Sequence, residues 1–282
     1  MCLFHDASQY IHAWLLKQMH VKEESLTDWL LYYLSERDDR IIYQAFSRNE
    51  ESLIGADWEW WIITEDEGYS HSPRGYRFLV QAKKLKKGQD NFPLLNYCNK
   101  NGLQMDMLLD SARSRNAMPL YLFYSTDHAQ YSEQIKNFPH SAVVLDWCKS
   151  CINGCYLSPA MALKALAYGG PRTNISERQL VNNSLGLSIC DYPLEYDAVN
   201  QFLRRVNDAY KTVVGTESNQ DYKYGFDGIC HFDKGIPTYV RSLINGRGDR
   251  MDWLESEFRR QLDGVSGVSI VDLRKAKHSN MW

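Results

Sequence analysis

Three polar residues in the N-terminal half have types and a spacing suited to metal-assisted chemistry. Asp57 opens an aromatic and β-branched run just after Gly55, and Gln81 and Lys83 stand two residues apart in the next apolar run. Side chains at positions i and i+2 of a strand lie on the same face. Cleavage of a phosphodiester needs a held metal ion, an activated water and positive charge near the developing oxyanion. These residue types therefore suit phosphodiester hydrolysis.

Two strands, predicted to form a hairpin, position these residues. Residues 55–64 and 76–85 have strand-like composition and are joined by a polar segment that contains glycine and proline. The start of one strand of an antiparallel hairpin lies beside the end of the other, so we expect Asp57 beside Gln81 and Lys83. Apolar residues surround Gln81, and a buried amide needs a polar partner.

The flanking pattern predicts a mixed α/β fold. Residues 21–36 form an amphipathic helical pattern, 40–46 a short strand, 103–115 a helix and 119–124 a buried strand. This order predicts a mixed central β-sheet with flanking helices, in which a strand–helix–strand crossover follows an antiparallel meander. Further along the chain we predict strands at 142–145 and 268–273 and helices at 160–168, 194–211 and 252–261.

Composition limits the classes of protein. The chain has 282 residues and a formal net charge of −3, which excludes a globally basic nucleic-acid coat but leaves room for a local basic face. No run approaches the roughly 20 apolar residues that cross a bilayer, and the N-terminus lacks the pattern of a secretion signal. The seven cysteines are mostly scattered, as in reduced thiols, so we expect a cytoplasmic protein.

The segment Gly55-Ala56-Asp57, followed by a hairpin and Val80-Gln81-Ala82-Lys83, resembles the active-site pattern of the PD-(D/E)XK nuclease superfamily. The glutamine in place of the acid is similar to the variant of Mrr-like restriction endonucleases. The resemblance covers residues 20–125, and the order helix-strand-strand-strand-helix-strand also matches that restriction-endonuclease-like core. Ala56 replaces the usual proline, and neutral Gln81 supplies less charge to hold a divalent cation.

The resemblance implies a Mg²⁺-dependent endonuclease, with Mn²⁺ as a possible substitute. Asp57, Gln81 and the backbone carbonyl of Ala82 would bind the metal, and Lys83 would orient or deprotonate the attacking water. Glu24, at the start of the helix at 21–36, is the favoured additional metal ligand and is counted with Asp57, Gln81 and Lys83 among the catalytic residues.

Two other acids are alternatives to Glu24. The apolar stripe of the helix at 21–36 puts Glu23 closer to the buried edge than Glu24, although helix ends fray. Glu59 shares a strand face with Asp57 and is the second candidate for a compensating charge.

The resemblance also implies a nucleic-acid partner, with DNA favoured over RNA, and a setting in bacterial antiviral defence. The basic run that includes Lys84, Lys86 and Lys87 suits contact with a phosphate backbone, but lysines also keep sheet edges soluble. Gln104 resembles a glutamine that some relatives place near the site. A homodimer or a partner protein of a defence system is also implied, and no membrane partner is expected.

We divide the chain into residues 1–150, a PD-(D/E)XK-like nuclease core, and residues 151–282, a C-terminal mixed α/β extension of unknown role. The extension would shape the substrate groove or a partner surface. A catalytically silent module that keeps the fold and binds nucleic acid or a partner is the leading alternative, because Gln81 is neutral.

A cysteine cluster offers a separate alternative. Cys148, Cys151 and Cys155 have a spacing that suits zinc, with His140, Cys190 or His231 as fourth ligand. No second pair of cysteines completes a familiar zinc motif, so buried free thiols are the competing interpretation.

Overall fold

A computed structural model describes eleven stretches of the chain. They are residues 3–46, 54–64, 74–84, 91–92, 97–99, 102–124, 154–168, 175–176, 229–231, 236–246 and 264–274. The predicted elements at 142–145, 194–211 and 252–261 lie outside the described residues.

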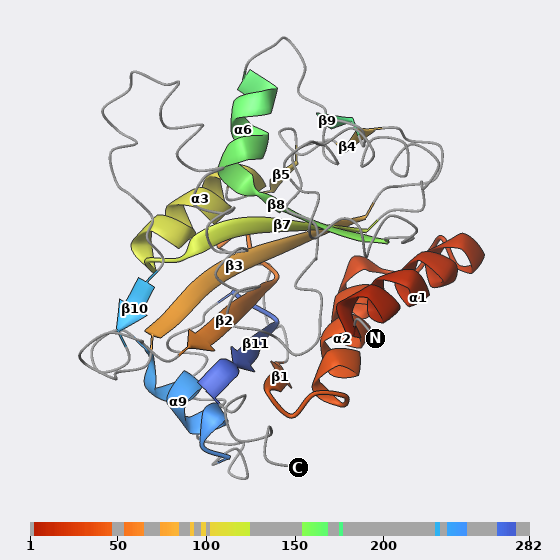
Figure 1. Ribbon diagram of the computed structural model, residues 1–282. Coiled ribbons are helices and arrows are strands. Elements are labelled where there is room, and N and C mark those ends of the chain that lie inside the picture. Colours follow the sequence, from red (N-terminus) through yellow and green to blue (C-terminus); the bar gives the residue numbers. More distant parts are fainter. Residues whose placement is uncertain are drawn as a thin grey trace, which may run out of the picture. The chain divides into compact units, whose positions relative to one another are not determined.

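A mixed β-sheet forms the centre of the fold, as the sequence predicts. Its strands follow the order β1-β11-β2-β3-β7-β8, and β10 also pairs with β3 (Figure 1). The pairs β1–β11, β2–β3, β3–β10 and β7–β8 are antiparallel, whereas β2–β11 is parallel. The strands are β1 (Ile41–Ala45), β2 (Trp58–Thr64), β3 (Arg74–Lys84), β7 (Met118–Tyr124), β8 (Cys155–Pro159), β10 (Ile229–His231) and β11 (Gly267–Asp272).

Strands β2 and β3 form the predicted hairpin. Their register runs from Trp58 opposite Val80 to Thr64 opposite Arg74. All seven residues of β2 are buried, which explains why this strand reads as a continuous aromatic and β-branched run. The hairpin brings the start of β2 beside the end of β3.

The predicted meander of three consecutive strands is wrong at its first step. Strand β11 lies between β1 and β2, with Tyr43 opposite Ser269 on one side and Ser269 opposite Trp60 on the other. Strands close in sequence usually become neighbours, but the apolar residues of β11 fill the space between these two strands. The buried residues Val268, Ile270 and Val271 give β11 the composition of a central strand.

Five helices are described. The predicted helices at 21–36, 103–115 and 160–168 are confirmed, while two helices were not predicted. Within the described residues, no helix has the length and apolar character needed to span a bilayer. The helices are α1 (Leu3–Lys17), α2 (Glu23–Ser35), α3 (Gln104–Ser114), α6 (Ala160–Tyr168) and α9 (Thr238–Ile244).

Among the described residues, four short strands form two small sheets apart from the main one. β4 (Asn91–Phe92) pairs with β9 (Ile175–Ser176), and β5 (Cys98–Asn99) pairs with β6 (Gly102–Leu103). The β5–β6 hairpin leads directly into α3.

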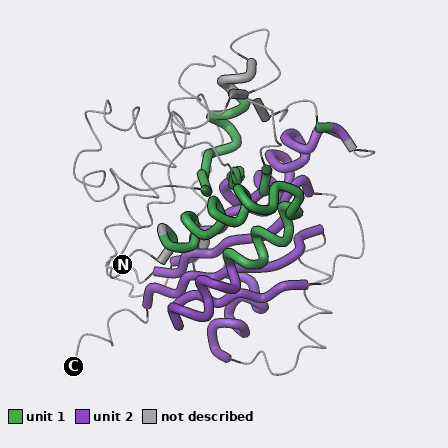
Figure 2. Tube along the Cα trace, turned by 90° about the vertical axis from the view of Figure 1, so that its right-hand side faces the viewer, with its two compact units in different colours: residues 1–30, 82–97, 120–220 green, residues 31–81, 98–119, 221–282 purple. Residues whose placement is uncertain are grey.

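The chain divides into two compact units, coloured separately in Figure 2. The first unit contains residues 1–30, 82–97 and 120–220, and the second contains residues 31–81, 98–119 and 221–282. Each unit takes segments from both sides of residue 150. The division at residue 150 that the sequence suggested is therefore not a boundary between the two units.

Within the first unit, α1 packs tightly on the start of β8. The Ser8 hydroxyl oxygen accepts hydrogen bonds from the backbone N–H groups of Gly154 and Cys155, at 2.8 and 3.1 Å. A Cβ atom at Gly154 would lie 2.7 Å from the Ser8 carbonyl oxygen and 2.7 Å from the His12 nitrogen. Only glycine allows the helix to approach the strand this closely.

Candidate active site

Asp57 and Gln81 meet where β2 begins, as the hairpin predicts. Extending the register of Trp58 opposite Val80 by one residue places Asp57 opposite Gln81. The Gln81 Nε2 atom donates a hydrogen bond to Asp57 Oδ2 at 2.5 Å. Gln81 is buried and Asp57 is half-buried, so the carboxylate retains access to solvent. The predicted need of the buried amide for a polar partner is confirmed.

The backbone of Asp57 is held from both sides. Its N–H donates to the Val80 carbonyl oxygen at 2.9 Å, and its own carbonyl oxygen accepts from the N–H of Ser266 at 2.6 Å. Ser266 immediately precedes β11. The position of Asp57 therefore depends on β3 and on a segment more than two hundred residues later in the chain.

Gly55 allows α3 to approach the same place. Its φ angle is +68°, in the left-handed region that favours glycine. A Cβ atom there would lie 2.5 Å from the Gln104 carbonyl oxygen and 2.6 Å from the Leu108 nitrogen. The absence of a side chain at Gly55 thus seats the first turn of α3 against the segment that leads to Asp57.

Gln104 extends the polar contacts of the site. It is the first residue of α3, and its Nε2 atom donates to Gln81 Oε1 at 2.8 Å. In the part of the chain that the structure describes, its own Oε1 atom is buried without a hydrogen-bond partner. A chain of contacts therefore runs from Gln104 through Gln81 to Asp57, and Gln104 lies near the candidate site, as predicted.

Lys83 follows Gln81 by two residues on the same strand, and its surroundings belong to the first unit. Its Nζ atom lies 4.4 Å from the centre of the Tyr97 ring. An ammonium over an aromatic face is attracted by the electrons of the ring. The Tyr97 side chain remains 53% exposed, so the lysine is held on a ring that solvent still reaches.

Lys84 has a different role from the one predicted. Its Nζ atom donates to the carbonyl oxygens of Met19 at 2.9 Å and Val21 at 2.5 Å. These contacts tie the end of β3 to the connection between α1 and α2. A strand side chain next to Lys83 points to the opposite face, which corrects the assignment of Lys84 to phosphate binding. Lys86 and Lys87 lie outside the described residues.

Of the two acids at the start of α2, Glu23 contacts the strand. Its Oε1 atom accepts a hydrogen bond from the backbone N–H of Lys84 at 2.9 Å. The Glu24 side chain is exposed. The contact agrees with the helical phase, which places Glu23 nearer the buried edge, while the metal-binding roles of Glu24 and of the Ala82 carbonyl stay predictions.

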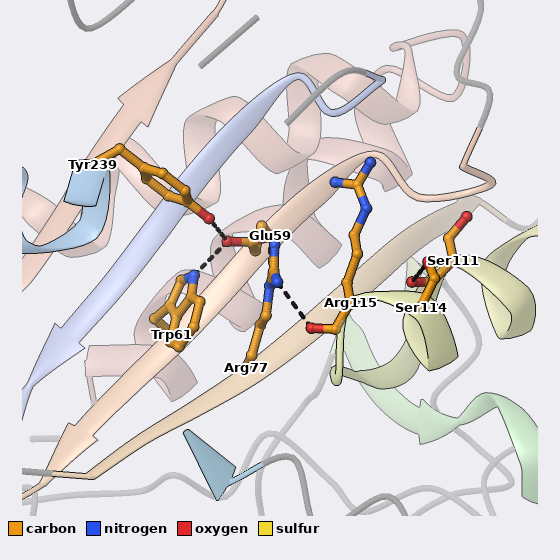
Figure 3. A network of polar contacts seen from close by, with 7 residues as sticks. All are labelled: Glu59, Trp61, Arg77, Ser111, Ser114, Arg115 and Tyr239. Carbon is orange, nitrogen blue, oxygen red and sulfur yellow. Dashed lines mark hydrogen bonds and ion pairs between the residues drawn. The ribbon is translucent and has the colours of Figure 1, made fainter. Parts of the chain in front are cut away.

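Glu59 lies in a separate buried network, drawn in Figure 3. Its Oε2 atom accepts from Arg77 Nε at 2.9 Å and from Arg77 Nη2 at 2.6 Å. Its Oε1 atom accepts from Trp61 Nε1 and from the Tyr239 hydroxyl. Because both oxygens are engaged, the network corrects the prediction that Glu59 supplies charge to a metal site.

The same network anchors the other end of α3. Arg77 Nη1 donates to the carbonyl oxygen of Arg115 at 2.9 Å, just after the helix (Figure 3). Burial raises the pKa of the Tyr239 hydroxyl well above its usual value, and the nearby Glu59 charge raises it further. Tyr239 therefore stays a neutral donor. Sequence reasoning missed this role of Arg77, although a charged residue within an apolar strand signals a buried partner.

The groups near Asp57 include oxygen atoms of the kind that a hard divalent cation takes as ligands. Among the described residues no three His, Cys, Asp or Glu side chains gather, so a metal ion at Asp57 would need neutral oxygen ligands and water beside this carboxylate. One carboxylate with an amide oxygen, a backbone carbonyl and water is a set that Mg²⁺ accepts. The Gln81 amide turns its N–H group toward Asp57, so it would have to rotate for its oxygen to join Asp57 as a ligand.

The cysteine cluster is described only at Cys155. This residue is buried in β8, and burial raises the pKa of its thiol to about 12, against a smaller opposing effect of a hydrogen bond with Ser8. Cys155 is therefore a neutral thiol. The zinc alternative stays a prediction, because Cys148 and Cys151 and the side chains of the possible fourth ligands lie outside the described residues.

A family model described as "Family of unknown function (DUF6615)" matches residues 3–274. The chain belongs to this family. The DUF6615 match begins at α1 and ends just after β11, so it includes both compact units and every described helix and strand. No curated protein and no solved structure gives a significant match.

Proposed function

We propose that this protein is a metal-dependent nuclease that hydrolyses phosphodiester bonds, with DNA as the favoured substrate. The observation that carries the proposal is the chain of contacts from Gln104 through Gln81 to Asp57, where the start of β2 meets β3. The order of elements and the residues Asp57, Gln81 and Lys83 are those that the resemblance to PD-(D/E)XK nucleases requires.

Asp57 and Gln81 would hold Mg²⁺, or Mn²⁺ in its place, together with the backbone carbonyl of Ala82. An acid at the start of α2, Glu24 or Glu23, would supply the charge that neutral Gln81 lacks. The bound cation would act as a Lewis acid and make its bound water more acidic. Asp57 is suited to this role because its backbone is fixed on two sides while its side chain retains access to solvent.

Lys83 would orient the attacking water and stabilise negative charge at the phosphate. Its strand position, two residues after Gln81, places it on the same face of β3 as that amide. The Tyr97 ring attracts the ammonium by its face. A lysine ammonium carries three N–H groups, which suits it to donate to water and to phosphate oxygens.

The cellular setting is proposed from the resemblance. It implies a cytoplasmic enzyme of a bacterial antiviral defence system, acting as a homodimer or with a partner protein. Light scattering of the purified chain during size-exclusion chromatography would distinguish a homodimer from a monomer that needs another protein.

A catalytically silent module that binds nucleic acid or a protein partner is the second candidate. The observation in its favour is that the Gln81 amide presents its N–H group, and not its oxygen, to Asp57. In that arrangement the amide itself satisfies the carboxylate. Magnesium dependence separates the two functions, because a silent module binds its partner equally well in chelator.

The test is a cleavage assay on linear DNA, supercoiled DNA and RNA, with Mg²⁺, Mn²⁺ or chelator. Asp57→Asn removes the charge without changing the shape of the residue, and Lys83→Met removes the ammonium but keeps most of the chain length. The control is Asp110→Asn, which changes the same charge on a side chain of α3 that is 74% exposed. Folding of each variant is checked by circular dichroism and thermal unfolding.

We expect Mg²⁺-dependent cutting that each site variant lowers at least about 100-fold, while the control matches the wild type. Cutting that survives both site variants would remove Asp57 and Lys83 from the active site. Binding without cutting in every metal condition would favour the silent module.

A further inference from the structure

The two glutamines beside Asp57 are joined in a way that leaves one buried atom without a partner. Gln104 donates to Gln81 through Nε2, whereas its Oε1 atom has no hydrogen bond in the described part of the chain. Nearly all buried polar atoms are paired, and an unpaired one costs free energy. The oxygen end of the Gln104 amide is therefore not fixed by a hydrogen bond.

Both the oxygen and the nitrogen of the Gln81 amide form hydrogen bonds. Its Oε1 accepts from Gln104, and its Nε2 donates to Asp57. An amide turned by 180° about its last torsion keeps its shape and exchanges its oxygen with its nitrogen. After such a turn, the Gln81 oxygen would face the Asp57 carboxylate and its N–H group would face Gln104.

The turn of Gln81 requires Gln104 to turn as well. If Gln104 stayed in place, the N–H groups of the two amides would face each other. When both turn, Gln104 Oε1, which now has no partner, accepts from Gln81 Nε2. The two glutamines then still share one hydrogen bond. The hydrogen bond between Gln81 and Asp57 is lost, and the Gln81 oxygen faces the Asp57 carboxylate oxygen, an arrangement that is favourable only with a cation between the two oxygens.

We propose that Gln104 is a positioning residue whose amide turns together with that of Gln81 when a divalent cation binds at Asp57. The inference rests on the cation site of the proposed function. Without the cation, the Gln81 N–H group satisfies the carboxylate. With the cation, the Gln81 oxygen joins Asp57 as a ligand, and the cation shifts the equilibrium because only this orientation interacts favourably with it.

The backbone around Gln104 supports a movement confined to side chains. Its carbonyl oxygen lies against Gly55, where a Cβ atom would be only 2.5 Å away. The far end of α3 is fixed by the bond between Arg77 and the Arg115 carbonyl. A helix held at both ends keeps the Gln104 backbone in place while its amide rotates about a terminal torsion.

The experiment is a titration of the full chain with Mg²⁺, followed by the ¹⁵N side-chain amide signals of Gln81 and Gln104 in NMR spectra. Gln81→Leu and Gln104→Leu assign the two signals. We expect both signals to move with the same midpoint in the wild type and neither to move in Asp57→Asn. In Gln104→Leu, the Gln81 signal should still move, with a midpoint close to that of the wild type, because Gln104 forms one hydrogen bond with Gln81 in either orientation. Gln18→Leu, at an exposed position after α1, is the control.

A second variant keeps the test decisive where leucine disturbs folding. Gln104→Glu has nearly the same size and can only accept a hydrogen bond from Gln81. The Gln81 signal of this variant should lie near its Mg²⁺-bound position before any Mg²⁺ is added. A signal that stays at its metal-free wild-type position would overturn the inference.

The outcomes separate this inference from the nuclease activity. Coupled movement of both signals in a protein that cuts no nucleic acid would support the positioning role and reject the nuclease. Cutting accompanied by a stationary Gln104 signal would reject the positioning role alone. Failure of Mg²⁺ to move either signal would overturn the inference, whereas the cleavage assay decides the activity independently.

Discussion

At the scale of single residues, the contact between Lys83 and Tyr97 connects a half-buried charge with an exposed ring. The 4.4 Å separation between the ammonium and the ring centre is a favourable cation–π distance. Such a contact is worth about 0.5–1 kcal/mol at an exposed site. This is too little to determine the fold but enough to restrict the positions of a flexible lysine side chain.

We predict that Tyr97→Ala lowers kcat for nucleic-acid cleavage about two- to fivefold, which corresponds to the loss of such a contact, and that Tyr97→Phe restores most of it. The aromatic face, and not the hydroxyl, holds Lys83. Steady-state cleavage rates of the three proteins are the measurement, with KM determined separately. Equal losses in the Ala and Phe variants would contradict the role of the ring, and a change confined to KM would assign Tyr97 to substrate binding.

A second residue-scale prediction concerns pH and Cys155. Burial raises the pKa of the thiol from 9.0 to about 12, so the folded protein keeps its proton where the unfolded chain loses it. This contribution to stability is present below pH 9 and is lost as the pH rises from there towards 12. When the pH rises from 8 to 10, the free energy of unfolding of the wild type should fall by about 1 kcal/mol more than that of Cys155→Ala.

Urea unfolding of both proteins at pH 8 and pH 10 measures this difference. Equal losses in the two proteins would show that Cys155 does not titrate on unfolding. Alkylation followed by peptide mapping gives an independent check, because exposed Cys98 should react while the protein is folded and buried Cys155 should not.

At the scale of elements, α3 is the helix that organises the candidate site. Its start contacts Gly55 and carries Gln104, and the residue after its end accepts a hydrogen bond from Arg77. Both Gln81 and Arg77 belong to β3, four residues apart on one face. The two ends of α3 are therefore fixed to two places on β3. The start of the helix is held at the Gln81 amide, and the residue after its end is held at Arg77 of the Glu59 network.

We predict that Gly55→Ala lowers the free energy of unfolding by about 2–4 kcal/mol, from left-handed strain and a clash with α3, and abolishes cleavage. Gly246→Ala is the matched control, because Gly246 has a φ of +65° but a Cβ atom added there would meet no described atom within 4 Å. It should cost only about 1–2 kcal/mol. Chemical denaturation measures both, and equal costs would show that α3 does not press on Gly55.

At the scale of the whole molecule, the sheet is assembled from distant parts of the chain. Strand β11 is inserted between β1 and β2, and the residue before it binds the Asp57 carbonyl oxygen. Strand β8, which follows residue 150 in the sequence, pairs with β7, which precedes it. Residues 151–282 thus contribute to the sheet that holds the candidate site, rather than only adding an extension to it.

We predict that a chain ending at residue 150 does not fold cooperatively, because it lacks β8 and β11. Circular dichroism and thermal unfolding of this fragment beside the full chain measure the effect. Ile270→Ala in the full chain should cost about 2–5 kcal/mol, since Ile270 is fully buried in β11. The structural role of β11 would be contradicted if the fragment unfolded cooperatively. It would also be contradicted if Ile270→Ala had the same free energy of unfolding as the wild type.

The sequence by itself determined the hairpin and the meeting of its polar residues. Alternation along two strands joined by one turn is local, so the register that places Asp57 beside Gln81 followed from spacing alone. Helical phase likewise placed Glu23 nearer the buried edge than Glu24, and Glu23 is the acid that contacts β3. Such relations depend on neighbours within about thirty residues, where the periods of helix and strand are sufficient.

Only the tertiary structure decided which polar residues were already engaged. Glu59 has the spacing of a ligand, but Arg77, Trp61 and Tyr239 use both of its oxygens. Lys84 has the charge of a phosphate contact, but the connection between α1 and α2 takes its ammonium. The parallel pairing of β11 with β2 joins residues about two hundred positions apart, and the burial of apolar surface that selects such a partner is non-directional and leaves no periodic signal in the sequence.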